Sequence, residues 1–199
     1  APDKLENLIG QETAKYLIRK NLDWAMRSGE LPAGMLIYGP SGIGKTMIAG
    51  IISLELGIPF IPLSMADTSY SELSDAVEMA QEGAVLFLDE LQAAPKKLKD
   101  MLLVAFDPSK FREFVAIAAT TDPGALSLPL RRRFPLEIPL AEYNLEEAEA
   151  LTRARAEGMG LMLEPGASFA IARAAGSRRQ ARPAIAGQAM DRVLHCQRF

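Results

Sequence analysis

The sequence predicts an α/β fold, in which helices enclose a parallel sheet and a small all-helical domain follows. Strand-like and helix-like segments alternate from the start of the chain to about residue 142, which is typical of a parallel sheet wrapped by helices. From Asn144 onward the strand signals stop, and the remaining segments are rich in Ala and Arg. We therefore expect a nucleotide-binding α/β domain over residues 1–142 and a helical lid domain over residues 143–199.

Each expected element rests on its pattern of apolar residues. Short apolar runs predict strands, and apolar residues at helical spacing predict helices. In the first helix, for example, one face carries Ala14, Leu17, Ile18, Leu22 and Ala25. The expected strands are 35–38, 58–63, 84–89, 114–119 and 136–138. The expected helices are 11–27, 47–56, 71–81, 95–106, 146–157, 166–175 and 183–196.

Length and composition set the broad class of the protein. With 199 residues, the chain suits one domain of about 150 residues plus a small appendage. Hydrophobic residues make up 49% of it and charged residues 24%, which indicates an ordinary globule with a substantial core. The net charge of −3 gives no global support for a nucleic-acid-binding surface.

The same sequence favours a cytoplasmic location. The single cysteine, Cys196, cannot form an internal disulfide and suits a reducing cytosol. Neither a signal peptide nor an apolar segment long enough for a membrane span is present, so we expect no membrane contact. Because the chain begins with Ala1 rather than Met, we expect a processed or trimmed chain, which can lack flanking domains.

The most specific motif lies between the first expected strand and the helix after it. It consists of Gly39, Pro40, Ser41, Gly42, Ile43, Gly44, Lys45 and Thr46. These residues match GxxxxGK[ST], the phosphate-binding loop of nucleoside-triphosphatases, whose glycines let backbone N–H groups point at phosphate. Lys45 supplies a positive charge for the β- and γ-phosphates, and Thr46 a hydroxyl for Mg²⁺. A chance Gly-rich turn is the alternative, but the fixed positions coincide in under about 1% of chains this long. The motif predicts nucleotide binding.

A second motif completes the expected site. The apolar run 84–88 is typical of a strand buried on both faces, and it ends in Asp89 and Glu90. Catalytic groups in open α/β sheets collect at the carboxyl ends of strands. We expect Asp89 to hold Mg²⁺ through water, and Glu90 to polarise the water that attacks the γ-phosphate. A strand that simply meets a solvated turn is the alternative; beside a phosphate loop, the pattern favours ATP hydrolysis.

Two further segments carry candidate catalytic groups. Thr120 and Thr121 end an expected strand, and a strand between the first strand and the Asp89 strand would bring a hydroxyl to the γ-phosphate. Thr is also common at strand ends without any function. Arg131, Arg132 and Arg133 end a short segment bracketed by Pro and Phe. They suit either a solvated helix end or a fixed arginine that a neighbouring subunit presents to a γ-phosphate.

Taken together, these motifs resemble those of the AAA+ ATPases, and within them the RuvB family of Holliday-junction branch-migration motors. The resemblance spans nearly the whole chain, from Leu5 to about Val193. The phosphate loop is similar to the family's Walker A motif, 86–90 to its Walker B motif, and 119–121 to its sensor 1 segment. What the resemblance implies is a five-stranded parallel sheet of order 5-1-4-3-2 in an αβα sandwich, followed by a helical lid.

The resemblance also implies roles for single residues. The segment with Leu8 and Ile9 is similar to the family's adenine pocket, so these residues are expected to contact ATP. By position, Arg133 takes the role of the arginine finger and Arg131 that of its structural neighbour. Ser64 lies where such enzymes place a polar residue that can restrain the catalytic glutamate. The implied assembly is a homo-oligomeric ring, usually hexameric and dependent on ATP, with Mg²⁺–ATP bound between subunits.

The chain departs from the RuvB pattern in three places. After Gln92 it runs quickly to the next strand and lacks the hairpin with which such motors contact their partner protein. It ends at Phe199, where a winged-helix DNA-binding domain would follow. The lid arginine that senses nucleotide is displaced: Arg182 or Arg179 can take its role, and a helix that begins at Pro183 favours Arg182. These departures weaken the branch-migration interpretation and leave the ATPase interpretation intact.

Two classes of function remain open. One is a ring motor that remodels DNA in branch migration, recombination, repair or replication. The other is an AAA+ ATPase that remodels or loads a polypeptide partner or protein adaptor, or a nucleotide-dependent assembly switch. The sequence has no aromatic-glycine pore loop of the protein-unfoldase kind, and the overall similarity favours DNA. A basic cluster of Lys96, Lys97 and Lys99 suits a solvated helix start, or else contact with DNA or a polypeptide.

Overall fold

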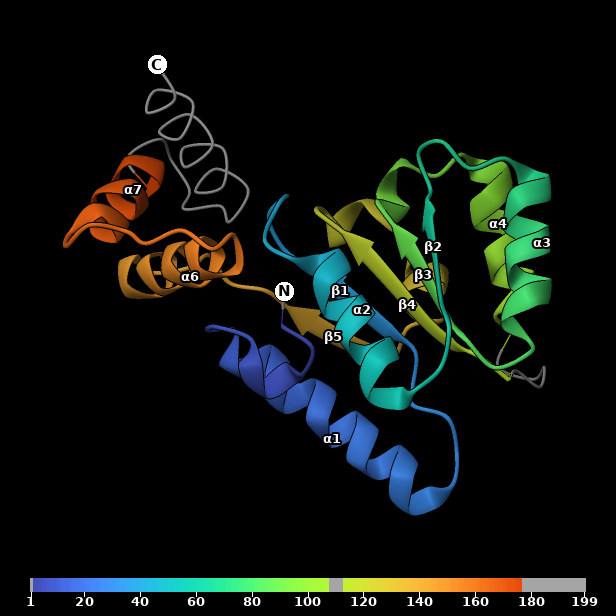
Figure 1. The fold of residues 1–199 in the computed structure, drawn as a ribbon. Helices are drawn as coiled ribbons and strands as arrows, with labels where there is room; N and C mark the ends of the chain where they lie inside the picture. The colour runs from blue at the N-terminus through green and yellow to red at the C-terminus, as the bar shows by residue number, and fades with distance from the viewer. Residues whose placement is uncertain (1, 108–112, 177–199) are drawn as a thin grey trace.

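A five-stranded parallel sheet forms the centre of the computed structural model, which describes residues 2–107 and 113–176 (Figure 1). The strands are β1 (Met35–Tyr38), β2 (Phe60–Ser64), β3 (Val85–Asp89), β4 (Val115–Thr120) and β5 (Leu136–Pro139). They lie in the order β2-β3-β4-β1-β5, and every neighbouring pair is parallel. Counted from the opposite edge of the sheet, this order is β5-β1-β4-β3-β2, so the expected order 5-1-4-3-2 is confirmed.

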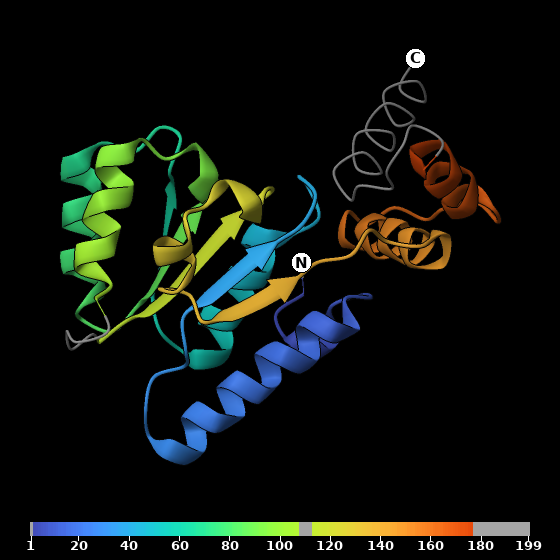
Figure 2. The same ribbon diagram turned by 180° about the vertical axis from the view of Figure 1, so that it is seen from behind.

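Helices cover both faces of this sheet. In chain order they are η1 (Leu5–Asn7), α1 (Glu12–Ser28), α2 (Lys45–Leu56), α3 (Tyr70–Ala80), η2 (Leu91–Ala93), α4 (Lys96–Ala105), η3 (Pro123–Ala125) and α5 (Leu128–Arg131). Seen from both sides, α3 and α4 lie next to each other at the β2 end of the sheet (Figures 1 and 2). The expected αβα sandwich is therefore confirmed.

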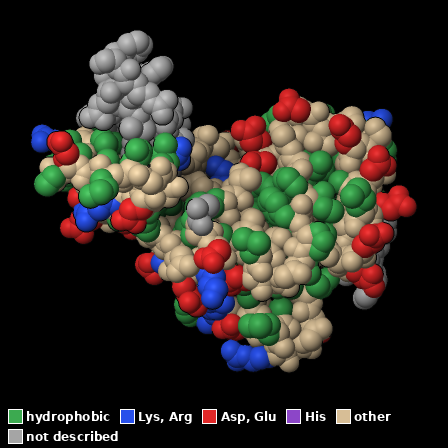
Figure 3. Space-filling model, in the orientation of Figure 1, with side chains coloured by type: hydrophobic (Ala, Val, Ile, Leu, Met, Phe, Trp, Pro, Cys, Tyr) green, Lys and Arg blue, Asp and Glu red, His purple; other side chains and the backbone are tan. Residues whose placement is uncertain are grey.

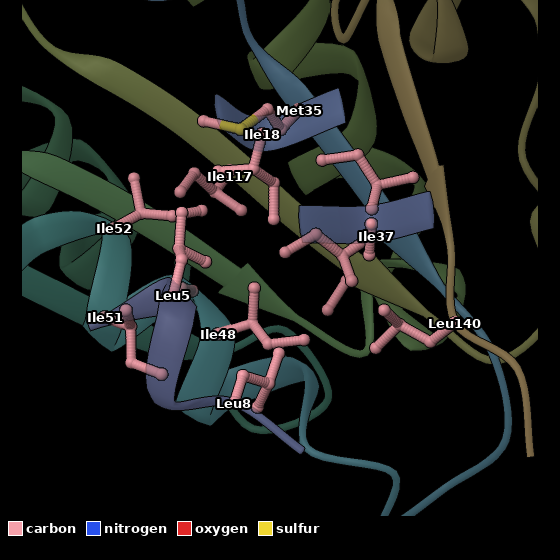
Figure 4. Close-up of a cluster of buried hydrophobic side chains, with 14 of the residues drawn as sticks. Leu5, Leu8, Ile18, Met35, Ile37, Ile48, Ile51, Ile52, Ile117 and Leu140 are labelled. Atoms are coloured by element: carbon pink, nitrogen blue, oxygen red, sulfur yellow. The ribbon is translucent and has the colours of Figure 1, made fainter. Parts of the chain in front are cut away.

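Alternation along each strand divides the core into two clusters. On β1, Met35 and Ile37 point toward α1 and α2, where they pack with Ile18, Ile48 and other aliphatic side chains (Figure 4). Leu36 points to the opposite face and belongs to the cluster of α3, α4 and α5. Successive strand residues face opposite sides, so a sheet covered twice needs the nearly continuous apolar runs seen in the sequence.

Two elements begin two residues away from the expected position, each for a local reason. Strand β2 begins at Phe60 rather than at residue 58, because Ile58 closes the end of α2: its N–H donates to the Ser53 carbonyl and its carbonyl accepts from Ser53 Oγ. Helix α2 begins at Lys45 rather than at residue 47, because the phosphate loop runs directly into its first turn.

A pair of helices follows the sheet. They are α6 (Leu145–Gly158) and α7 (Ala167–Gly176), which pack against each other (Figure 1). Asn144 and Glu147 form a capping box that fixes the start of α6, which explains why the helix begins one residue before its expected position. The expected third lid helix over 183–196 lies outside the described residues. The domain boundary at 142/143 stays a prediction.

Phe106 tests the packing of the second core cluster. Its ring lies 5.5 Å from the Phe114 ring and 5.7 Å from the Phe134 ring, centroid to centroid, and it is fully buried. We expect Phe106→Ala to lower the free energy of unfolding by about 3–5 kcal/mol in urea titrations, because it leaves a large cavity. Val104→Ala, at a position 61% exposed in the last turn of α4 just before Phe106, is the control and should change it little. Equal losses in both variants would contradict this account of the core.

Candidate nucleotide-binding site

The sequence motifs meet in one cavity at the carboxyl edge of the sheet. Strand β4 lies between β1 and β3, so the ends of these three strands are neighbours. The cavity has a volume of about 310 Å³. Its lining consists of Ser41, Gly42, Gly44, Lys45, Thr46, Met47, Asp89, Glu90, Thr120 and Thr121. Residues predicted from three separate motifs therefore face a common space, as topology at such an edge requires.

The phosphate loop is shaped by its glycines and by Lys45. Gly44 has a φ of +107°, a conformation that other residues rarely adopt. A Cβ on Gly39 would lie 2.7 Å from the Leu140 carbonyl oxygen, so only glycine fits there. Lys45 is buried, and its Nζ donates to the carbonyls of Gly39 and Pro40 at 2.9 Å each. The loop thus curves around the lysine ammonium group and suits an anionic group such as phosphate.

Thr46 and Asp89 form the part of the cavity that fits a magnesium ion. Thr46 Oγ1 donates to Asp89 Oδ2 at 2.8 Å, which brings a hydroxyl and a carboxylate together. These are the hard oxygen ligands that Mg²⁺ prefers, and Mg²⁺ completes its shell with water and phosphate oxygens. In the described part of the chain, no cluster of three or more His, Cys, Asp or Glu side chains forms a metal site of its own.

Glu90 has an unusual backbone. Its φ of +53° lies in the left-handed region, which is rare for a residue other than glycine. The Glu90 N–H donates to Asp89 Oδ1 at 2.9 Å and so helps to hold this conformation. Strained backbone of this kind is concentrated at functional sites. The Glu90 side chain is exposed, and it lines the cavity beside Asp89.

Thr120 and Thr121 differ in their surroundings although both line the cavity. Thr120 is fully buried; its Oγ1 donates to Gln92 Oε1 at 2.7 Å and accepts from the Asp122 N–H at 3.1 Å. Thr121 is exposed, and its Oγ1 accepts from Gln92 Nε2 at 3.2 Å. Gln92 is not among the residues predicted from the sequence motifs. The available signal was a polar side chain two residues after the Asp89–Glu90 pair.

The arginine segment lies apart from this cavity, and its members have different partners. Arg131 forms an ion pair with Glu137, in which Nη2 lies 2.6 Å from Oε1 and 2.8 Å from Oε2. Arg133 Nη2 donates to the Leu103 carbonyl at 3.1 Å, and its buried Nε has no hydrogen-bond partner among the described residues. Arg132 is exposed. None of these arginines lines the cavity.

The expected adenine-pocket residues lie outside the cavity too. Leu8 is buried in the core, its carbonyl accepts a hydrogen bond from Lys15, and neither Leu8 nor Ile9 lines the cavity. Their assignment as ATP contacts stays a prediction. Gln11 follows them, and its side-chain amide makes two hydrogen bonds with the Ala141 backbone. This clasp ties the N-terminal segment to the linker that leads into α6.

Two further expected roles concern Ser64 and the nucleotide-sensing arginine of the lid. Ser64 Oγ donates to Asp67 Oδ2 at 3.0 Å, so in this structure its hydroxyl caps its own turn, and the described residues show no bond from it to Glu90. Arg179 and Arg182, the candidate sensors in the lid, lie outside the described residues. Both assignments stay predictions.

Comparisons with known proteins agree with the geometry. A family model described as "ATPase family associated with various cellular activities (AAA)" matches residues 35–141. The chain is 31% identical to the Holliday junction branch migration complex subunit RuvB of Bifidobacterium adolescentis, over 96% of this chain and 57% of that protein. It is also 31% identical to RuvB of Solibacter usitatus, over 96% of this chain and 60% of that one.

Solved structures give the same result. The Thermotoga maritima RuvB Holliday junction branch migration motor superposes with a TM-score of 0.80 at 30% identity, over 93% of this chain and 62% of that chain. Its P216G mutant also superposes with a TM-score of 0.80, at 31% identity, over 92% of this chain and 63% of that chain. The chain thus spans about three fifths of the length of these relatives. The helices described here include none that is long and apolar enough to cross a membrane.

Tyr143 lies in the linker before α6, and the ionisation of its hydroxyl can be measured. Its hydroxyl donates to the Ile43 carbonyl of the phosphate loop at 3.3 Å, and burial raises its pKa above the usual value of 10. Since an unfolded chain loses this proton first, the contribution to stability is present below pH 10 and is lost as the pH rises above it.

We therefore expect Tyr143→Phe to remove a late component from the alkaline titration of tyrosinate absorbance, to which four tyrosines contribute in the parent protein. Tyr16→Phe, on the exposed face of α1, is the matched control. A late component that persists in Tyr143→Phe would show that this hydroxyl is not the protected one.

Proposed function

Because this chain belongs to the AAA family of ATPases, we propose that it binds Mg²⁺–ATP in the cavity and hydrolyses it as a RuvB-type motor that acts on DNA. The observation that carries the proposal is the meeting of the phosphate loop, the Asp89–Glu90 pair and Thr121 at one edge of the sheet. Each group alone is common. Their combination supplies a phosphate cradle, a metal-binding carboxylate, a base and a hydroxyl donor.

The proposed chemistry is transfer of the γ-phosphoryl group to water. Lys45 and the loop N–H groups hold the β- and γ-phosphates, and Thr46 and Asp89 hold the metal. Bound Mg²⁺ supplies positive charge that neutralises the phosphate oxygens. Glu90 accepts a proton as the water oxygen bonds to the γ-phosphorus and the bond to the bridging oxygen breaks. ADP and phosphate leave.

We place the third positive group, Arg133, in a neighbouring subunit of a homo-oligomeric ring. Arg131 is neutralised by Glu137, whereas the described residues show no carboxylate paired with Arg133. Among the described residues, the Arg133 guanidinium is held by one carbonyl, and its buried Nε has no partner. Such a group can exchange the carbonyl for an anionic oxygen at favourable free energy. This supports Arg133 as the residue that a partner presents to the γ-phosphate.

The DNA part of the proposal depends on the relatives rather than on the surface charge. The helix α3 presents Glu72, Asp75 and Glu78 to solvent, and Figure 3 shows acidic side chains along that side of the molecule. Lys97 lies over the Tyr70 ring, and Lys99 donates to the Gln92 carbonyl. Between β3 and β4 the described residues form η2 and α4 and no hairpin. DNA contact through α3 is therefore not part of the proposal.

The test is the steady-state ATPase rate with duplex DNA, with branched DNA and without DNA, each at low and high salt. Because phosphate contacts release counterions, we expect stimulation by DNA that weakens as salt rises. Hydrolysis that is unaffected by DNA but stimulated by a polypeptide would contradict the DNA role and favour the protein-remodelling alternative. The absence of any hydrolysis would contradict the enzymatic proposal itself.

Glu90→Gln tests the proposed base. The amide keeps the shape of the side chain but cannot accept the proton from water, so we expect ATP binding to persist while turnover falls by a factor of about 10² or more. Calorimetry measures the binding and phosphate release the turnover. Glu82→Gln, at an exposed position beyond the end of α3, is the matched control. Turnover equal to wild type in Glu90→Gln would mean that the water is activated by another group.

Arg133→Ala tests the shared site. We expect this variant to bind ATP about as well as wild type and to hydrolyse it more slowly by a factor of about 10³ or more. Arg132→Ala, which removes a neighbouring exposed charge, should retain activity. In a mixture, Arg133→Ala supplies an intact Glu90 and Glu90→Gln supplies an intact Arg133, so mixed rings contain complete interfaces. Activity restored by mixing confirms the trans role, and no restoration in rings shown to be mixed contradicts it.

A further inference from the structure

Gln92 connects the two threonines of the cavity to the end of the β3 strand. It lies in η2, two residues after Glu90, and its side-chain amide bonds to both Thr120 Oγ1 and Thr121 Oγ1. Its position is fixed from the other side, because its backbone carbonyl accepts a hydrogen bond from Lys99 Nζ of α4 at 2.9 Å. One side chain thus joins groups from the ends of β3 and β4.

The hydrogen bonds of Thr120 determine which way the amide of Gln92 points. A hydroxyl has one proton to donate and can accept through its oxygen. Thr120 Oγ1 accepts from the Asp122 N–H, and two acceptors lie within reach of its proton: the Asp122 carbonyl at 3.1 Å and the Gln92 amide oxygen at 2.7 Å. The shorter contact, to Gln92, takes the proton. With the Thr120 proton on Oε1, the Gln92 Nε2 group faces Thr121 and donates to its oxygen.

This orientation has a consequence for Thr121. Because Gln92 donates to the Thr121 oxygen, the Thr121 proton cannot be used in that bond and must point elsewhere. Thr121 is exposed and lines the cavity together with Lys45 and Glu90. Its O–H is therefore available to an acceptor inside the cavity, while the hydroxyl of Thr120 is already satisfied by protein atoms.

We propose that Gln92 is a positioning residue for hydrolysis: its amide holds the Thr121 hydroxyl so that the proton is directed into the cavity, toward the γ-phosphate and the attacking water. The inference rests on the proposed ATPase function and adds a residue to its site. Hydrogen bonds to charged groups contribute more than neutral ones, so a correctly aimed donor matters most where charge develops on the phosphate oxygens.

A purely structural role is the competing explanation. Gln92 could simply tie η2 to the end of β4, in which case its loss would reduce stability without regard to Thr121. The two explanations differ in whether the effects of removing Gln92 and of removing the Thr121 hydroxyl depend on each other. If Gln92 acts through Thr121, removing it has no further effect once the Thr121 hydroxyl is gone, whereas independent effects multiply.

The experiment is a double-mutant cycle on steady-state ATP hydrolysis with Gln92→Met, Thr121→Val and the double variant. Both substitutions roughly keep side-chain size and remove the hydrogen-bonding groups. We expect kcat to fall about tenfold or more in each single variant, with KM for ATP within about twofold of wild type, and no further fall in the double variant. A fall in the double variant equal to the product of the single falls would overturn the proposal, as would unchanged kcat in Gln92→Met.

Gln92→Glu separates an effect on catalysis from an effect on folding, because Glu has nearly the same shape as Gln. A carboxylate cannot donate, so the Thr121 proton turns toward it and kcat should fall at least as far as in Gln92→Met. Wild-type kcat in this variant would overturn the proposal. Gln81→Met is the matched control: Gln81 Oε1 accepts from the N–H of Glu113, which lies just before β4, and its loss should leave kcat unchanged.

These outcomes separate the inference from the function on which it rests. Wild-type protein that hydrolyses ATP, together with an inactive Glu90→Gln and multiplicative effects in the cycle, contradicts only the role of Gln92. Wild-type protein without hydrolysis contradicts the proposed function and the inference together.

Discussion

The parallel pairing of β4 between β1 and β3 is the constraint on which the site depends. Tyr38 pairs with Thr120, and Leu88 pairs with Ala118, so backbone hydrogen bonds fix how far each strand extends at the carboxyl edge. The phosphate loop, the carboxylates after β3 and the hydroxyls after β4 reach one cavity because of this register. A shift by one residue would also turn every strand side chain to the wrong face, and two buried clusters resist that shift.

The site combines rigid supports with one strained residue. Its supports are buried strands and the first turn of α2, whereas Glu90 sits in a left-handed conformation just past the end of β3. Such a conformation costs free energy and persists because Asp89 and the following η2 hold it. Through the Gln11–Ala141 clasp and the Tyr143–Ile43 bond, the N-terminal segment and the lid linker are tied to each other and to the phosphate loop. These contacts connect the linker before α6 directly to the phosphate loop.

Much of this could be predicted from the sequence, and the rest depends on contacts between distant residues. Local patterns located all five strands, placed Asp89 and Thr121 at strand ends and placed Lys45 where the phosphate loop meets a helix, because buried parallel strands and phosphate loops have strong signatures. The strand order came from family resemblance and not from local pattern. The bond from Gln92 to both threonines, and the contact of Arg133 with α4, join residues far apart in sequence, so no local spacing predicts them.

The central claim is that the phosphate loop holds ATP through Lys45. A calorimetric titration of wild type, Lys45→Ala and Lys96→Ala with Mg²⁺ and a slowly hydrolysed ATP analogue tests it most directly. Lys96 is exposed at the start of α4 and outside the cavity, so its variant controls for lost charge. We predict that only Lys45→Ala loses affinity, by about tenfold or more, while its thermal unfolding stays cooperative. Affinity in a folded Lys45→Ala equal to that of wild type would contradict the account.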